Sequence, residues 1–165
     1  MRHNLPMPLV DLPDESHLRV IASMPAVDPV AGAELQAAID KLFAQFQREG
    51  RVVTWASELQ AEGALLVLAW TTAPISGCSH DKLGGVVSVF AERGGRRMLD
   101  APPMVVATRA GVRCTDRAGL RSLLAERLVD GESAVWLRSA TSLGEWRRDA
   151  GQRLADSPLA MLLSR

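Results

Sequence analysis

The run from Ala64 to Trp70 constrains the fold more than any other segment of this chain. All seven of its side chains are hydrophobic, and none carries a charge. Seven residues are far too few to cross a bilayer, which takes about 20 in a helix. A short continuous apolar run is typical of a strand buried on both faces. At a sheet edge it would expose unpaired backbone beside hydrophobic side chains, so the sequence predicts that 64–71 lies in the interior of a sheet.

The residues around this run predict a mixed α+β core. In the segment 33–49, apolar side chains recur at helical spacing from Leu35 to Phe46, and Gly50 ends the pattern. Other segments have the alternating or continuous apolar patterns of strands. The expected strands are 18–24, 51–57, 64–71 and 104–108, with a short returning strand at 112–114, and the expected helices are 33–49 and 79–93. This βαββαβ order predicts a ferredoxin-like core over about residues 18–114, with an antiparallel sheet and both helices on one of its faces.

The two ends of the chain differ from this core. Residues 1–17 contain three prolines and no periodicity, which predicts an extended N-terminal arm. Residues 18–165 are expected to form a single α+β domain. After residue 114, leucines at helical spacing behind Asp116 and a capping-box pattern beginning at Ser142 indicate helices. We therefore expect a helical C-terminal extension over 115–165, with one further strand near 133–138.

Charge and cysteine usage narrow the class of protein. The 19 basic and 19 acidic residues cancel, so nothing electrostatic favours nucleic acid or an anionic membrane as a partner. Residues 1–15 lack the apolar stretch of a signal peptide, and Cys78 and Cys114 form no CxxC pair. We expect a soluble, cytoplasmic protein with free thiols. The three histidines lack metal-ligand spacing and no P-loop sequence is present, so no metal and no other cofactor is expected.

One short segment, Ser76 to Lys82, has the composition of a site. It stands where the apolar strand gives way to the second helix, and the first turn of a helix has unpaired N–H groups that attract anions. Candidate ligand-binding residues are Gly77, Cys78, Ser79, Asp81 and Lys82. The unpaired N–H groups at the helix start would also favour the thiolate form of Cys78, which makes this residue a candidate nucleophile. The segment therefore suits a small anionic ligand or thiol chemistry.

A purely structural account of the same segment stays open. Ser79 can cap the helix, with Asp81 favourably placed in the first turn. Gly77 can serve only to turn the chain, and Cys78 can be a small buried hydrophobic residue. Lys82 would then point to water, and none of these side chains would touch a ligand.

The chain resembles a family of small uncharacterised bacterial proteins that share this motif. The resemblance rests on Ser76-Gly77-Cys78-Ser79-x-Asp81-Lys82 after a hydrophobic strand, and on the strand, helix and two strands before it. It covers roughly residues 18–130. Members often carry the label "ABC transporter ATPase", but this chain has no Walker motif to support ATP hydrolysis. The resemblance implies a site at Gly77–Lys82 without naming a reaction.

Two functional hypotheses remain open at this point. The first is a ligand-binding or enzymatic site for an anionic group at Gly77–Lys82, with Cys78 as nucleophile. The second is a non-enzymatic interaction module, which uses an open sheet face or the C-terminal helices to pair with itself, as a homo-oligomer, or with another protein. A pocket with convergent polar groups around Cys78 would favour the first hypothesis. A broad exposed apolar patch, with Cys78 buried, would favour the second.

Overall fold

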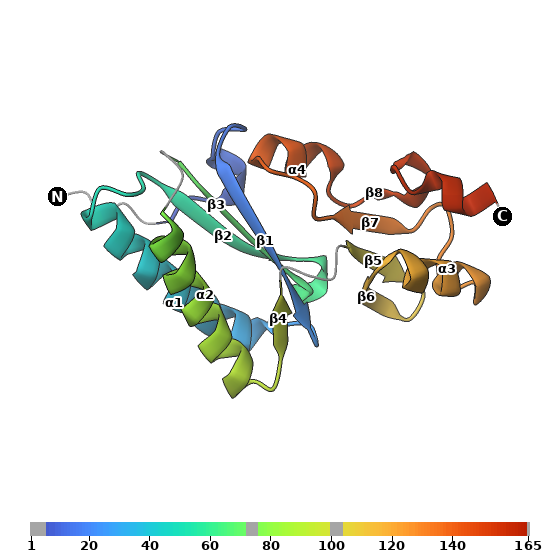
Figure 1. Cartoon of the computed structure of the whole chain (residues 1–165), viewed down its shortest axis with the longest axis horizontal. Helices are drawn as coiled ribbons and strands as arrows, with labels where there is room; N and C mark the ends of the chain where they lie inside the picture. The colour runs from blue at the N-terminus through green and yellow to red at the C-terminus, as the bar shows by residue number, and fades with distance from the viewer. Residues whose placement is uncertain (1–5, 72–75, 100–103, 165) are drawn as a thin grey trace.

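The described residues form two four-stranded antiparallel sheets, each accompanied by helices (Figure 1). The computed structural model describes residues 6–71, 76–99 and 104–164. No helix within these residues is long and apolar enough to cross a membrane. The α+β class expected from the sequence is confirmed.

The first sheet contains the predicted apolar strand in its interior. Its strands are β1 (His17–Met24), β2 (Trp55–Gln60), β3 (Leu65–Trp70) and β4 (Arg97–Leu99), in the spatial order β2-β3-β1-β4. Every neighbouring pair is antiparallel. All six residues of β3 are buried, and the strand pairs with β2 on one side and β1 on the other. The predicted interior position of 64–71 is therefore confirmed.

Two helices cover one face of this sheet. They are α1 (Pro29–Arg48) and α2 (Gly77–Arg93), which lie side by side in Figure 1. The predicted apolar stripe of α1 is buried, and it packs with alternate residues of β3, namely Leu66, Leu68 and Trp70. The helix starts four residues before the expected 33, because Asp28 caps it and Pro29 occupies its first position.

The fourth strand of the first sheet is not the one expected. The prediction placed 104–108 there, but the position beside β1 is occupied by the three-residue β4. The segment Met104–Thr108 is a strand, β5, but it belongs to the second sheet. β4 was missed because three residues, Arg-Met-Leu, are too few to show a strand period. The second predicted strand, 51–57, is also displaced, since β2 begins only at Trp55.

The second sheet corrects the expected helical extension. Its other strands are β6 (Gly111–Thr115), β7 (Ala134–Leu137) and β8 (Gln152–Arg153), in the order β6-β5-β7-β8. Two α-helices accompany them, α3 (Arg117–Ala125) and α4 (Leu143–Asp149), and a 3₁₀ helix spans Ala160–Ser164. The strand expected near 133–138 is confirmed as β7. The expectation of a helical extension was otherwise wrong, because β7 joins a second sheet to which β8 also belongs.

The second unit packs on the face of the first sheet that α1 and α2 leave uncovered. The remaining residues of β3, Leu65, Val67 and Ala69, share a core with Val105, and with Leu143 and Trp146 of α4. Arg138 also donates from Nη2 to the carbonyl oxygen of Val20 at 2.7 Å. Because β3 has a core on both sides, every one of its side chains must be apolar, which explains the run that dominates the sequence.

Residues 6–16 pack against this second core. Leu9 and Leu12 are buried in it, and Leu9–Asp11 forms a 3₁₀ helix. The backbone N–H of Met7 donates to the carbonyl oxygen of Trp55 at 3.0 Å. Part of the predicted arm, residues 1–5, lies outside the described residues, and the boundary at residue 18 stays a prediction.

Candidate functional site

The motif segment forms the first turns of α2, as the sequence predicted. The helix runs from Gly77 to Arg93, so Ser79 lies in its first turn and the helix continues through Phe90. The N-cap is Ser76, however, and not Ser79. The hydroxyl of Ser76 accepts from the backbone N–H of Ser79 at 3.3 Å, which satisfies one of the N–H groups that the helix start leaves open.

Ser79 points into the protein. It is fully buried, and its Oγ accepts from Nη1 of Arg51 at 2.6 Å. Arg51 forms an ion pair with Glu49 at 2.8 Å and lies over the ring of Phe46. A hydrogen bond from Gln45 and the charges of Arg51 and Lys82 lower the pKa of Glu49. Ser79 therefore connects α2 to the segment that follows α1, which is a structural role.

The other candidate residues of the motif are on the surface. Gly77, Cys78, Asp81 and Lys82 are all exposed. Cys78 is a free cysteine, as expected, but it is not the buried hydrophobic residue of the structural alternative. The structure thus separates the five predicted residues into one buried hydroxyl and four exposed groups around the first turns of the helix.

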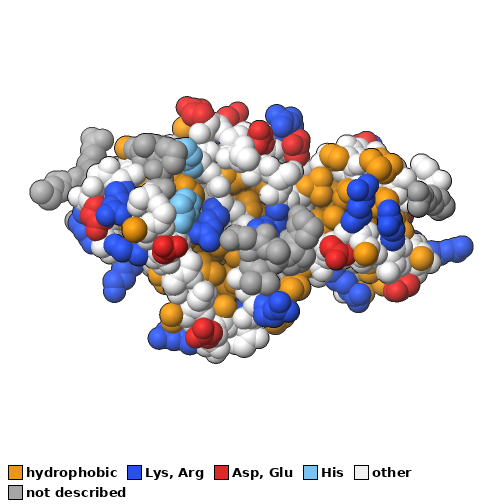
Figure 2. All heavy atoms as spheres, in the orientation of Figure 1, with side chains coloured by type: hydrophobic (Ala, Val, Ile, Leu, Met, Phe, Trp, Pro, Cys, Tyr) orange, Lys and Arg blue, Asp and Glu red, His pale blue; other side chains and the backbone are white. Residues whose placement is uncertain are grey.

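A ring cluster beside this helix start was missed by sequence reasoning. The Trp70 ring stacks on His17 with centroids 5.8 Å apart and meets His80 edge-on at 6.1 Å. Nη1 of Arg19 lies 3.5 Å from the carbonyl oxygen of His80. Figure 2 shows histidine and basic side chains close together on this face. The strand register that places His17 opposite Trp70 carries no local sequence signal. Within the described residues, no group of three potential metal ligands comes together.

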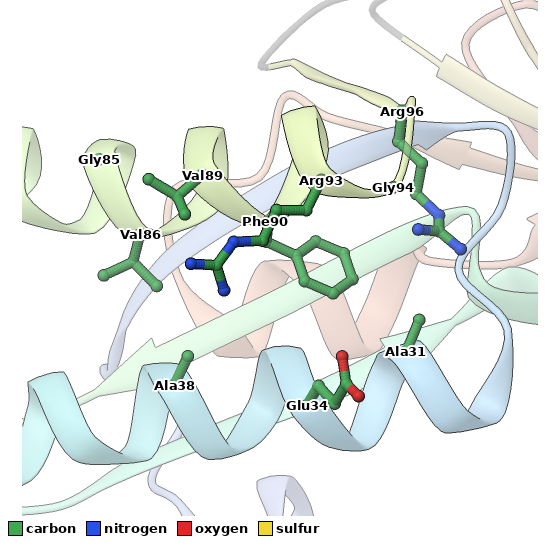
Figure 3. A pocket seen from close by; sticks show the side chains of 10 residues that line it. All are labelled: Ala31, Glu34, Ala38, Gly85, Val86, Val89, Phe90, Arg93, Gly94 and Arg96. Carbon is green, nitrogen blue, oxygen red and sulfur yellow. The ribbon is translucent and has the colours of Figure 1, made fainter.

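A hollow lies between α1 and α2, toward the C-terminal end of α2. We call it the interhelical groove, and its volume is about 480 Å³ (Figure 3). Its small lining residues are Ala31 and Ala38 of α1 and Gly85 of α2, together with Gly94 just after α2. Its described lining consists of Ala31, Glu34 and Ala38 from α1, Gly85, Val86, Val89, Phe90 and Arg93 from α2, and Gly94 and Arg96 after α2.

The interior of the groove is apolar and its borders are charged. The Phe90 ring lies between the helices, and Val89 is 49% exposed. Glu34 reaches in from α1 and Arg93 from α2, and no ion pair of either is found among the described residues. Arg96 lies over the Phe90 ring and pairs with Asp28 at 2.9 Å. Sequence reasoning missed the groove because two separate helical stripes do not reveal the space between them.

Comparisons with known proteins give no further guide to this site. No protein-family model, no curated protein and no solved structure matches the chain. The resemblance to the motif-sharing bacterial family therefore stays a prediction.

Proposed function

We propose that this protein is an interaction module, and that the interhelical groove receives the apolar surface of a protein partner. The observation that carries the proposal is the groove itself: about 480 Å³ of open space with a mainly apolar lining on the protein surface. Apolar side chains left in contact with water gain free energy when a partner covers them, at about 25 cal/mol per Å². Exposed apolar hollows with charged borders are typical of interaction sites.

The composition of the lining supports binding rather than catalysis. The ten described lining residues include no serine, threonine, cysteine or histidine, and Glu34 is the one carboxylate among them.

The neutral dye Nile red can test whether the groove binds apolar surfaces. We expect dilute protein to enhance the dye's fluorescence, and Val89→Glu to lower this enhancement at least about fivefold. Val53→Glu is the matched control, because Val53 is 52% exposed but lies outside the groove. Circular dichroism checks that each variant is folded. Equal dye binding by the wild-type protein and Val89→Glu would rule out the groove as the binding site.

A second candidate is the anionic-ligand or thiol site at Gly77–Lys82. The specific support is that Cys78 and Lys82 are exposed beside the start of a 17-residue helix, where anions are favoured. Alkylation of Cys78 by iodoacetamide, in Cys114→Ser protein, should then slow when phosphate is added. Cys114 is removed so that Cys78 is the one thiol that reacts. Burial raises the pKa of the Cys114 thiol, so its reaction would otherwise add a second pH dependence to the measurement. A phosphate-independent rate would leave Ser76 and Ser79 with structural roles alone.

We also propose that the first sheet and its helices form a ferredoxin-like unit. The element order β1-α1-β2-β3-α2-β4 and the antiparallel pairing support this assignment. We propose separately that the protein is cytoplasmic, and its two free cysteines support this location.

A further inference from the structure

We propose that the partner in the interhelical groove is a second copy of this chain, bound through a two-fold axis that runs along the groove. This inference rests on the proposed function, since it names the partner of the same site. It comes from the way in which the two charges at the borders of the groove are arranged.

Glu34 and Arg93 stand on opposite sides of one groove. Figure 3 shows both side chains extending toward the space beside the Phe90 ring, Glu34 from α1 and Arg93 from α2. Both residues are exposed. The groove therefore has one negative and one positive border.

A two-fold rotation about the groove converts this arrangement into complementary pairs. The rotation places α1 of one copy over α2 of the other, so each Glu34 lies on the same side of the interface as Arg93 of the second copy. A two-fold interface repeats every contact, so two such ion pairs form around one apolar centre. An axis across the groove would instead place Glu34 against Glu34 and Arg93 against Arg93. The charges thus select one orientation.

The apolar lining supplies the association energy in this arrangement. Val86, Val89 and Phe90 line the groove in both copies, and the second copy would shield them from water. Exposed ion pairs add little affinity, but like charges placed opposite each other are strongly unfavourable. An entirely acidic partner would meet the like charge of Glu34, and an entirely basic one that of Arg93, whereas a second copy meets no like charge at these two positions.

Charge exchange tests both the partner and the orientation. In sedimentation equilibrium, we expect the wild-type protein to form dimers as its concentration rises. Arg93→Glu alone and Glu34→Arg alone should each weaken the dimer at least about tenfold, because each creates two like-charge contacts. An equimolar mixture of these two variants should recover a heterodimer, and the double variant should recover a homodimer.

Matched controls separate this result from a general effect of charge. Arg121→Glu and Glu126→Arg make the same changes at exposed positions on and beside α3, and both should leave dimerisation unchanged. A dimer that is insensitive to the exchanges at 34 and 93, or a mixture that stays monomeric, would overturn the proposed pairing.

The outcomes also distinguish this inference from the proposed function. A wild-type protein that stays monomeric at every concentration, with Nile red binding that still depends on Val89, would refute self-pairing and leave the groove as a site for another protein. Dye binding that does not depend on Val89 would instead refute the proposal that the groove is a binding site. Nile red is neutral, so Arg93→Glu should keep its dye binding while it loses the dimer.

Discussion

Ser79 belongs to the motif predicted to bind a ligand, but its hydroxyl forms hydrogen bonds inside the protein. A buried hydroxyl without a partner is costly, and Ser79 avoids that cost by accepting from Arg51 and lying 3.1 Å from the hydroxyl of Ser76. Ser76 in turn caps α2. The two serines therefore fix the start of the helix, while Cys78 between them remains exposed.

Ser79→Ala should destabilise the protein by about 1 to 2 kcal/mol, the range for a lost hydrogen bond with a charged donor that water can partly replace. Ser88→Ala is the matched control, because Ser88 is exposed on the same helix and should change stability by less than about 0.5 kcal/mol. Urea unfolding followed by circular dichroism measures both. Equal midpoints for the two variants would contradict the role assigned to the Arg51–Ser79 contact.

At the residue scale, the sequence predicted that Ser79 lies in the first turn of a helix. It could not predict the direction of its side chain. That direction depends on Arg51, which is 28 positions away in the sequence and is brought close only when α1 and α2 pack together. For the same reason, the opposition of Glu34 and Arg93 across one groove had no signal in the sequence.

At the scale of an element, α1 depends on Asp28 at its start. The Asp28 carboxylate accepts from the backbone N–H of Ala31 at 2.9 Å and forms an ion pair with Arg96. The Ala31 hydrogen bond, and to a smaller extent the charge of Arg96, lower the pKa of Asp28 below its usual 3.8. The same carboxylate therefore connects the first turn of α1 to the end of the interhelical groove.

The stabilisation by Asp28 should depend on pH. A lowered pKa in the folded state means that the contribution is present above about pH 3.8 and is lost as the pH falls through the lower folded value. Asp28→Asn keeps an oxygen that can cap the helix but does not titrate. The wild-type protein should have the higher urea midpoint at pH 7, and the difference should shrink below pH 3.8. A difference that stays constant from pH 7 to pH 2.5 would exclude this linkage.

The elements that the sequence predicted well are those with long periodic patterns. The apolar stripe of α1 and the run in β3 were both located correctly. Asp28 followed by Pro29 is a recognisable helix start, but it was not used, so the predicted helix began too late. The three residues of β4 could not be found in this way, because such a short strand is specified by its pairing with β1 and not by its own pattern.

At the scale of the whole molecule, the two sheets share a core. Trp146 of α4 is buried among residues of the first sheet, and its Nε1 donates to Oε1 of Gln60 at 3.0 Å. No local pattern distinguishes a strand of one sheet from a strand of the other, which is why β5 was assigned to the wrong sheet.

Trp146→Ala should therefore destabilise both sheets together, by about 3 to 5 kcal/mol. Hydrogen exchange should report similar losses of protection for the amides of β3 and β5, because the two strands contribute to one core. Trp136→Ala is a useful comparison, since Trp136 is only half-buried and should cost less. Loss of protection in β5 alone would show that the two sheets unfold independently.

The contacts of Arg147 have a consequence for the timing of synthesis. Its Nη2 donates to the carbonyl oxygens of Leu9 and Leu12, and the second of these contacts joins residues 135 positions apart. A ribosome that adds 5 to 20 residues per second needs about 7 to 27 seconds to make that stretch. In the last part of this interval, after β4 has been made and before α4 follows, the face of β3 that holds Leu65 and Val67 lacks the cover of α4. The nascent chain thus passes through a stage in which one face of its most hydrophobic strand is open to contact with other molecules near the ribosomal exit.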